Sequence, residues 1–388
     1  MTIPDGPDFF DWRREQFPFF QHKICLTHAS VAPLPARASE ALVDFSRRLA
    51  HDGQFDFVSQ DIYARAKERI AQMIGNGAKA DEVAMANSTS HALGLVATSF
   101  PWKAGDNCVV VDGDFPANVV IWKNLTPTQG VEIRMVPYRE TGAWTWDDFE
   151  PLLDKNTRLV AVSAVNFLTG CPLDLKTLGD KLHERGIALC VDAIQAFGAV
   201  SPDYSSADFV CADAHKWMLG PLGAAFTWFS PRYLSQMRPQ ILGWLAIEGR
   251  DDWFNYGITP FPTAERFEPG ARNYLGIVGM EASLALLQDV GIESVQNRVV
   301  KLRDYGAGKL AEAGAKVLWR GDESKPSGTV SFRVEDKDMK VLNAHLDERF
   351  ALALRPDRAG QQWIRVSAHF MNCEDDVDEL AAMVKAFQ

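Results

Sequence analysis

The 388-residue chain lacks paired cysteines: its six cysteines form neither a CxxC motif nor the spacing of a zinc site. They lie at positions 25, 108, 171, 190, 211 and 373, several within apolar runs such as IALCVDAI, where a thiol behaves as a small buried hydrophobe. This usage is typical of a reduced, intracellular protein. We therefore expect no disulfide framework, no metal site and a cytoplasmic location.

The sequence also lacks a long basic run, and its formal net charge is −11. Proteins that bind nucleic acids concentrate positive charge, so we expect no nucleic-acid partner. No apolar run approaches the ~20 residues that a transmembrane helix requires, so we expect a soluble protein with no membrane partner. Acids and arginines interrupt the aromatic residues near the N-terminus, which argues against a signal peptide there.

Internal repeats and low-complexity segments are absent too, and the composition is ordinary for a globular protein, with 47% hydrophobic and 23% charged residues. From about residue 80, short β-rich runs alternate with helical patterns. This alternation predicts an α/β fold whose mostly parallel central sheet is covered by helices on both faces. The expected strands are 83–86, 107–113, 131–138, 158–166, 187–194, 209–214 and 223–229.

The stretch 240–262, rich in Gly, Trp and Phe, breaks this alternation, and we expect it to be a loop. Two long helical patterns follow, and then a smaller α/β unit whose last helix starts with a predicted capping box of Asn372 and Asp375. The length of the chain favours two domains. We predict an N-terminal arm at 1–25, a large domain at 26–255 and a smaller α/β C-terminal domain at 256–388.

Two chemically reactive residues stand at the ends of neighbouring predicted strands. Asp192 closes the strand at 187–194, and Lys216 follows the strand at 209–214 within ADAHKWMLGPLG. Ligands bind beyond the carboxyl ends of parallel strands, so both side chains can open on one cleft. Taken singly, the acid reads as a helix cap and the lysine as a surface residue in a turn. Together they match pyridoxal phosphate, which needs a lysine for its Schiff base and a carboxylate against its pyridine nitrogen.

The turn NSTSHALGL at 87–95 offers a place for the phosphate of this cofactor. Its small hydroxyl residues meet the first turn of a predicted helix, where backbone amides and the helix dipole favour an anion. Serine and threonine are also ordinary helix N-caps, so the turn alone does not identify a phosphate site.

Seven segments, in order along the chain, resemble the class V aminotransferases. This fold-type I pyridoxal phosphate family also includes cysteine desulfurases and isopenicillin N epimerases. The resemblance runs from about residue 25 to the end of the chain. It rests on STSHALGLVA, DGDFPANVVIW, AVNFLTG, VDAIQAFGAV, DAHKWMLGPLG, RFEPGARN and IRVSAHFMNCEDDVDEL.

The resemblance implies a role for each matching residue. It makes Lys216 the covalent attachment point of pyridoxal phosphate and Asp192 the partner of its pyridinium. The remaining implied roles are Gln195 and Asn166 near the 3-hydroxyl, Thr89 and Ser90 with His215 at the phosphate, Phe115 stacked on the ring, and Arg365 at the substrate carboxylate.

Simpler explanations stay open for several of these residues. Asn166 fits a turn, Phe115 fits a hydrophobic core, and Arg365 can neutralise a buried acid instead of a substrate. His91 either points at the cofactor or only caps the helix that follows.

Two positions depart from the family pattern. Ala271, in GARN, replaces the threonine whose segment usually reaches the phosphate of the neighbouring subunit. Asp213 stands where relatives often have serine or glycine, and an ionised carboxylate repels a phosphate. We therefore expect the side chain of Asp213 to point away from it.

The leading prediction for the reaction is transamination of an amino acid, a small-molecule substrate. An epimerase or a lyase that breaks a bond at the β-carbon remains the alternative, because both use the same site. The resemblance implies that a cysteine desulfurase needs a nucleophilic cysteine shortly before the carboxylate-binding arginine; the run 355–365 has none, and Cys373 lies beyond it. That activity is therefore disfavoured, as is a non-catalytic protein that only binds the cofactor. The resemblance further implies a homodimer with shared active sites and the region 240–275 at its interface.

Overall fold

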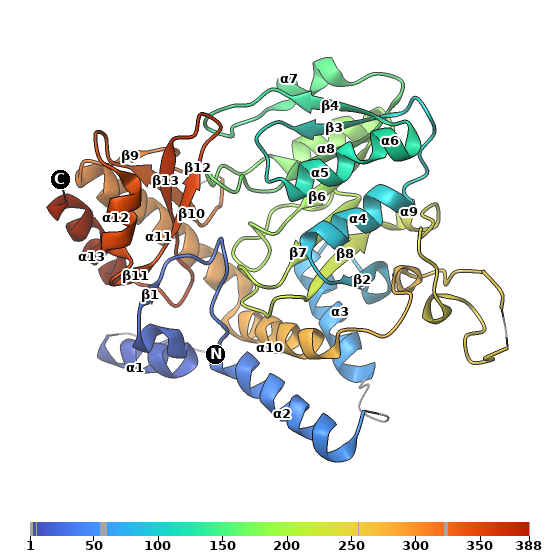
Figure 1. Ribbon diagram of the computed structural model, residues 1–388, viewed down its shortest axis with the longest axis horizontal. Coiled ribbons are helices and arrows are strands. Elements are labelled where there is room, and N and C mark those ends of the chain that lie inside the picture. Colours follow the sequence, from blue (N-terminus) through green and yellow to red (C-terminus); the bar gives the residue numbers. More distant parts are fainter. Residues whose placement is uncertain (1–2, 5, 55–59, 255, 322–324, 388) are drawn as a thin grey trace.

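The computed structural model describes residues 3–4, 6–54, 60–254, 256–321 and 325–387 (Figure 1). The strands of its largest sheet are β2 (Val83–Ala86), β3 (Asn107–Val111), β4 (Glu132–Val136), β5 (Thr157–Ser163), β6 (Ala188–Asp192), β7 (Phe209–Asp213) and β8 (Ala225–Phe229). They lie in the order β2-β8-β7-β6-β5-β3-β4. Only β8 runs antiparallel to its neighbours in this described sheet, so the prediction of a mostly parallel sheet is confirmed.

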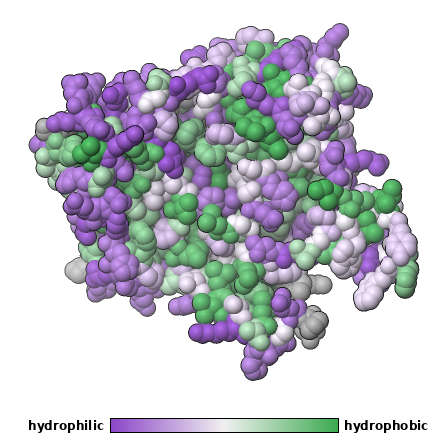
Figure 2. Space-filling view, in the orientation of Figure 1, coloured by the Kyte–Doolittle hydropathy of each residue, from purple (hydrophilic) through white to green (hydrophobic). Residues whose placement is uncertain are grey.

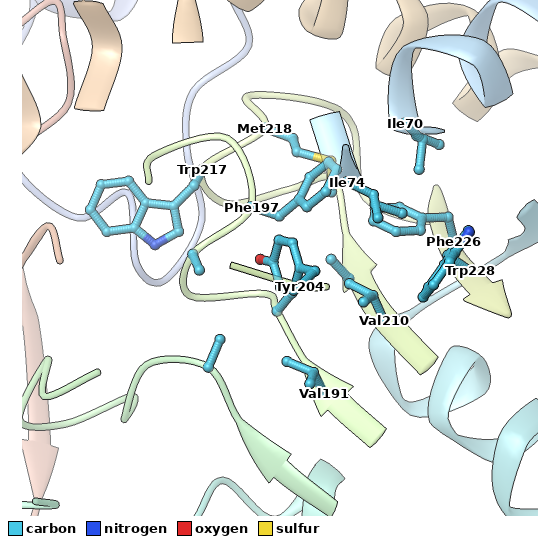
Figure 3. Close-up of a cluster of buried hydrophobic side chains, with 14 of the residues drawn as sticks. Ile70, Ile74, Val191, Phe197, Tyr204, Val210, Trp217, Met218, Phe226 and Trp228 are labelled. Atoms are coloured by element: carbon cyan, nitrogen blue, oxygen red, sulfur yellow. The ribbon is translucent and has the colours of Figure 1, made fainter. Parts of the chain in front are cut away.

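Side chains of the central strands enter two separate cores, one on each face of the sheet. On β6, Leu189 and Val191 enter one core, while Ala188 and Cys190 enter the other. Figure 3 shows part of the first core, where Val191 and Val210 lie among aromatic side chains. Because both faces are covered, the strands appear in the sequence as continuous apolar runs.

Helices supply the outer layers on both sides of this sheet (Figure 1). Buried residues of α4 (Thr89–Ser99) and α5 (Ala117–Lys123) join one core, and those of α8 (Leu175–Glu184) join the other. Three shorter helices follow strands along the chain: α6 (Leu125–Gln129), α7 (Trp146–Phe149) and α9 (Pro231–Leu234).

A second, antiparallel sheet is formed by the C-terminal part of the chain. Its order is β12-β13-β10-β9, with β9 (Lys316–Val317), β10 (Thr329–Arg333), β12 (Ala353–Pro356) and β13 (Gln362–Ser367). It shares a core with residues of α11 (Ile292–Glu312), α12 (Met339–Leu346) and α13 (Glu374–Ala386). Beside it, β1 (Ile24–Cys25) pairs with β11 (Phe350–Ala351), which brings the segment after residue 25 next to β13.

Three N-terminal helices were not predicted: α1 (Pro7–Gln16), α2 (Ala36–Asp52) and α3 (Gln60–Ile74). On α3, Tyr63, Ala66 and Ile70 are buried at helical spacing, so the signal was present in the sequence. Both α2 and α3 pack against α10 (Tyr274–Val290), which also joins the core of the seven-stranded sheet. The predicted division of the chain after residue 255 stays a prediction.

The predicted capping box of the last helix is wrong by one residue. Cys373 is the N-cap of α13, and the Asp376 carboxylate accepts the Cys373 backbone N–H at 3.1 Å. The reason is that Asn372 is used elsewhere: its side-chain amide donates to the Cys25 carbonyl at 3.0 Å and ties this end of α13 to β1.

No single helix among the described residues is long and apolar enough to cross a membrane. By length and composition alone, α10 and α11 pass that criterion only as a pair, and the pair is bent by 82°.

Candidate active site

A cavity of about 230 Å³ opens beyond the carboxyl ends of β6 and β7. The seven-stranded sheet brings Asp192 and Lys216 to its wall, and β12 and β13 bring Arg355 and Arg365. The structure thus gathers eight of the nine predicted site residues around one space. These eight are Thr89, Ser90, Phe115, Asp192, Gln195, His215, Lys216 and Arg365.

Lys216 lies in the turn that follows β7, and its side chain is almost fully buried. Burial, reinforced by the charge of Arg365, lowers the pKa of its amine from 10.5 to about 8, although Asp192 acts in the opposite direction. Such a lysine is a neutral amine in a useful fraction of molecules near neutral pH. Only the neutral amine can act as a nucleophile or a base.

Close packing next to Lys216 fixes this turn. Gly198 has a φ of +99°, and a Cβ added there would lie 2.5 Å from the Trp217 carbonyl oxygen, so only glycine fits. The Trp217 indole donates a hydrogen bond to Gln195 Oε1 at 3.1 Å, and Gln195 Nε2 donates to the Ala29 carbonyl at 3.0 Å. The motif VDAIQAFGAV therefore orients Gln195 and supports the lysine turn at the same time.

Asp192 ends β6 with its carboxylate buried in the wall of the cavity. It accepts one hydrogen bond, from the Ile194 backbone N–H at 3.0 Å. Burial raises its pKa to about 7, and the nearby carboxylates of Asp114 and Asp213 add to that rise. A cationic group against Asp192 would reverse this shift, which is what a protonated pyridine nitrogen supplies.

The turn between β2 and α4 presents an anion site. Ser88 is the N-cap of α4 and accepts the His91 backbone N–H at 3.1 Å. The hydroxyl of Thr89 is buried without a hydrogen-bond partner in the described structure, and Ser90 also faces the cavity. His91 instead accepts the Asn87 backbone N–H through Nδ1 and lines a neighbouring cavity, so it acts as part of the helix cap.

Asp213 lines the cavity, and the expectation that its side chain points away from the phosphate stays a prediction. His215 holds it there: Nδ1 of His215 lies 2.7 Å from Asp213 Oδ1. Ala271 lies outside this cavity and lines the neighbouring one, beside His91.

Asn166 is the predicted site residue that the structure does not bring to the cavity. Its side-chain oxygen accepts the backbone N–H groups of Leu168 and Thr169 at 3.0 and 2.9 Å. It therefore stabilises its own turn, and the prediction of a position near the 3-hydroxyl is not supported by the geometry.

Phe115 lines the cavity with its ring 5.4 Å from Lys216 Nζ. It is held by Asp114, a residue of the DGDFPAN segment that was not predicted to belong to the site. Asp114 accepts hydrogen bonds from the Ser163 hydroxyl at 2.7 Å and from the Phe115 backbone N–H at 2.7 Å. A loop anchored in this way keeps an aromatic face in place over the lysine.

Arg365 is buried, and no acid neutralises it among the described residues. Its Nη1 donates to the Phe167 carbonyl at 2.6 Å, its Nη2 donates to the Ser30 hydroxyl at 2.5 Å, and its Nε has no partner. Burial, with the neighbouring charge of Arg355, lowers its pKa to about 9. The alternative that Arg365 pairs with a buried acid is therefore excluded for the described part of the chain. Ser30 and Arg355 were not predicted to belong to the site, although Arg355 begins the cysteine-free segment 355–365.

These residues fit pyridoxal phosphate. The unpaired Thr89 hydroxyl at a helix N-terminus suits a phosphate oxygen, and the sparsely bonded Asp192 suits a ring nitrogen that carries a proton. Lys216 supplies the amine that this cofactor requires. The α/β fold and this set of residues define a fold-type I pyridoxal phosphate enzyme.

The model of the aminotransferase class-V family matches residues 24–380, and the chain belongs to this family. Pyridoxal phosphate, the cofactor of the family, is accordingly the cofactor of this protein.

Some relatives of this chain are named cysteine desulfurases, and another is named an aminotransferase. A probable cysteine desulfurase of Methanothermobacter thermautotrophicus is 27% identical over 350 residues, which cover 88% of this chain and 86% of the relative. An uncharacterized aminotransferase of Schizosaccharomyces pombe is 28% identical, over 99% of this chain and 98% of the relative. The apo structure of a cysteine desulfurase from Thermococcus onnurineus has a TM-score of 0.88 at 22% identity, over 100% of this chain and 98% of that one. This last likeness confirms the predicted fold.

Proposed function

We propose that this pyridoxal phosphate enzyme transfers the amino group of an amino acid to a 2-oxo acid. One observation carries the proposal: Lys216, Asp192 and Arg365 line the same cavity, and no acid pairs with the Arg365 guanidinium in the described structure. An amine, a buried carboxylate and a carboxylate-binding fork are the groups that such a reaction requires.

The chain's own residues would divide the work as follows. When bound, pyridoxal phosphate withdraws electrons from the α-carbon of the amino acid and carries its amino group. Lys216 Nζ, with a pKa near 8, would take the proton from that α-carbon and deliver it to the bound cofactor, as transfer of the amino group requires. Asp192 holds a proton on the ring nitrogen, and Arg365 orients the substrate carboxylate through its planar fork.

The test is a screen of amino donors with the purified holoenzyme. A suitable donor removes the visible absorbance of the lysine-bound cofactor, and adding a 2-oxo acid restores it while a new amino acid forms. If the absorbance of the bound cofactor responds to amino acids but no amino group reaches any 2-oxo acid, transamination is refuted.

A second candidate is a lyase that cleaves a carbon–sulfur bond at the β-carbon, supported by the 27% identity to a probable cysteine desulfurase. No thiol supports transfer of the sulfur to the protein itself. The six cysteines are all buried, and none lines the cavity in the described structure. Release of pyruvate, ammonia and sulfide from cysteine, or of pyruvate, ammonia and cysteine persulfide from cystine, without a persulfide on the protein, would favour this candidate over transamination.

We also propose a homodimer with shared active sites and the region 240–275 at its interface. Part of this region projects from the body of the molecule, and Figure 2 shows apolar surface on it. Ile241, Trp244, Trp253, Phe254 and Ile258 are between 61% and 84% exposed, which is unusual for side chains of this kind. Light scattering on the holoenzyme is expected to give a dimer mass. A monomer that retains the cofactor tightly would contradict the proposal.

A further inference from the structure

Two arginines on one face of the small sheet share a single hydroxyl group. Ala353 of β12 lies opposite Arg365 of β13, and Arg355 is two residues further along β12, so both arginines lie diagonally on the same face. Ser30 Oγ accepts Arg355 Nη2 at 3.1 Å and Arg365 Nη2 at 2.5 Å. A serine oxygen that accepts two hydrogen bonds still has its own proton to donate.

The positive charge of this pair is not balanced by the protein. Neither Arg355 nor Arg365 forms an ion pair with an acid in the described part of the chain, whereas the carboxylate of Asp213 lies 2.7 Å from Nδ1 of His215. Two guanidinium groups held side by side repel each other, and burying them is costly unless anions compensate them. A single carboxylate neutralises one of the two charges and leaves the other uncompensated.

We propose that the substrate is an amino dicarboxylic acid, with its α-carboxylate on Arg365 and its side-chain carboxylate on Arg355. This inference rests on the proposed function and narrows it to a substrate class. The assignment of the two ends follows from burial: Arg365 is 2% exposed, whereas Arg355 is only partly buried. The α-carboxylate must lie close to the reacting carbon and therefore to Lys216, and the Arg365 charge acts on Lys216 more strongly than the Arg355 charge does. Ser30 has its proton free to donate to either carboxylate.

The pair also explains why arginine, and not lysine, occupies both positions. A guanidinium offers two parallel N–H groups to a planar carboxylate and stays charged when buried. Burial lowers the pKa of both kinds of cation, but from a lower starting value in Lys216, whose pKa falls to about 8, than in Arg365, whose pKa of about 9 keeps it charged at neutral pH.

Binding of unreactive ligands to the holoenzyme tests the proposal without turnover. Isothermal titration calorimetry would compare glutarate with glutaramate, in which a neutral amide replaces one carboxylate and the size is unchanged. The same comparison is made with succinate and succinamate. We expect at least one dicarboxylate to bind about 10- to 100-fold more tightly than its amide, the usual range for a charge-assisted contact. Equal affinities within both pairs would overturn the proposal.

Variants then assign the second carboxylate to its arginine. Arg355→Gln is expected to abolish the preference for the dicarboxylate and leave glutaramate binding unchanged, while Arg365→Gln weakens both ligands. Arg358→Gln, in the same loop but paired with Asp112 at 2.6 Å, is the matched control for the loss of one charge. If Arg355→Gln weakens both ligands equally, the two arginines share one carboxylate and the proposal is wrong.

The proposed function and the proposed substrate class can be refuted separately. A preference for the dicarboxylate without amino transfer would refute the proposed function, but it would still support the binding of two carboxylates by Arg355 and Arg365. Amino transfer with equal binding of diacid and amide would refute only the substrate class. The comparison within the wild-type protein requires no variant, so a folding defect in Arg355→Gln does not remove the test.

Discussion

The two walls of the cavity differ in the charged groups that they carry. The wall from the seven-stranded sheet mixes Asp192 and Asp213 with Lys216, and burial moves the pKa of Asp192 to about 7 and that of Lys216 to about 8. The wall from the four-stranded sheet presents Arg355 and Arg365 and no described acid. A group that exchanges protons needs a pKa near the working pH, whereas a group that holds an anion needs a lasting charge. The contrast supports a proton-exchanging wall, formed by the seven-stranded sheet, and an anion-binding wall, formed by the four-stranded sheet.

The largest effect should come from Lys216→Ala on the proton-exchanging wall. Turnover is expected to fall by at least about 10³-fold, because the residue proposed as both attachment point and base is lost. Borohydride reduction and peptide mass spectrometry should mark Lys216 in the wild type and no residue in the variant. Lys123→Ala, on an exposed position of α5, is the control and should keep full activity. An adduct on another lysine would contradict the assignment.

Asp192→Asn should lower turnover by about 10²-fold, since the proposed charge partner of the ring nitrogen is removed. The variant also has a pH signature in the apoprotein. Because burial raises the Asp192 pKa to about 7, its contribution to stability is full below pH 4 and is lost as the pH rises through 7.

Removing this carboxylate should therefore make the variant relatively more stable at pH 8 than at pH 4, by up to about 4 kcal/mol. Chemical denaturation of both apoproteins at the two pH values measures the difference. Asp251→Asn, on an exposed loop, is the control. A difference in stability that does not change with pH would contradict a buried, proton-binding Asp192.

On the anion-binding wall, Ser30→Ala removes the hydroxyl that both arginines share. We expect KM for the amino acid to rise about tenfold with little change in kcat, because the guanidinium groups lose a positioning contact and keep their charge. Steady-state kinetics separate the two constants, and Ser235→Ala on the surface serves as the control. A fall in kcat with unchanged KM would assign Ser30 to the proton-exchanging wall instead.

The smallest effect is expected for Phe115→Leu, which replaces an aromatic face by an aliphatic one. Cofactor affinity should fall a few-fold and by no more than about tenfold, the usual worth of ring contacts beyond their buried area. Phe115→Tyr keeps the ring and should keep the affinity. Fluorescence titration of the apoprotein with pyridoxal phosphate gives both values. Unchanged affinity in the leucine variant would show that Phe115 only fills space.

The local sequence was enough to place most residues of the wall that the seven-stranded sheet forms. Asp192 and Lys216 stand at the ends of buried strands, and the position of a residue at the end of a parallel strand is set by the apolar run before it. Asn166 does not line the cavity, and its amide oxygen accepts backbone N–H groups two and three residues ahead, so its role near the 3-hydroxyl stays a prediction. A turn residue was one of the two explanations that the sequence left open for Asn166, and the structure shows the hydrogen bonds of that turn.

The sequence by itself determined the α/β fold, the parallel sheet and the lysine, because these follow from apolar periodicity and from motifs contained in single segments. Only the tertiary structure decided that Ser30 lies between Arg355 and Arg365 and that no described acid accompanies them. That arrangement joins residues more than 300 positions apart through the contact of an N-terminal segment with a C-terminal sheet. The charge balance of a site is a sum over everything that surrounds it, so it exists only once the chain has folded.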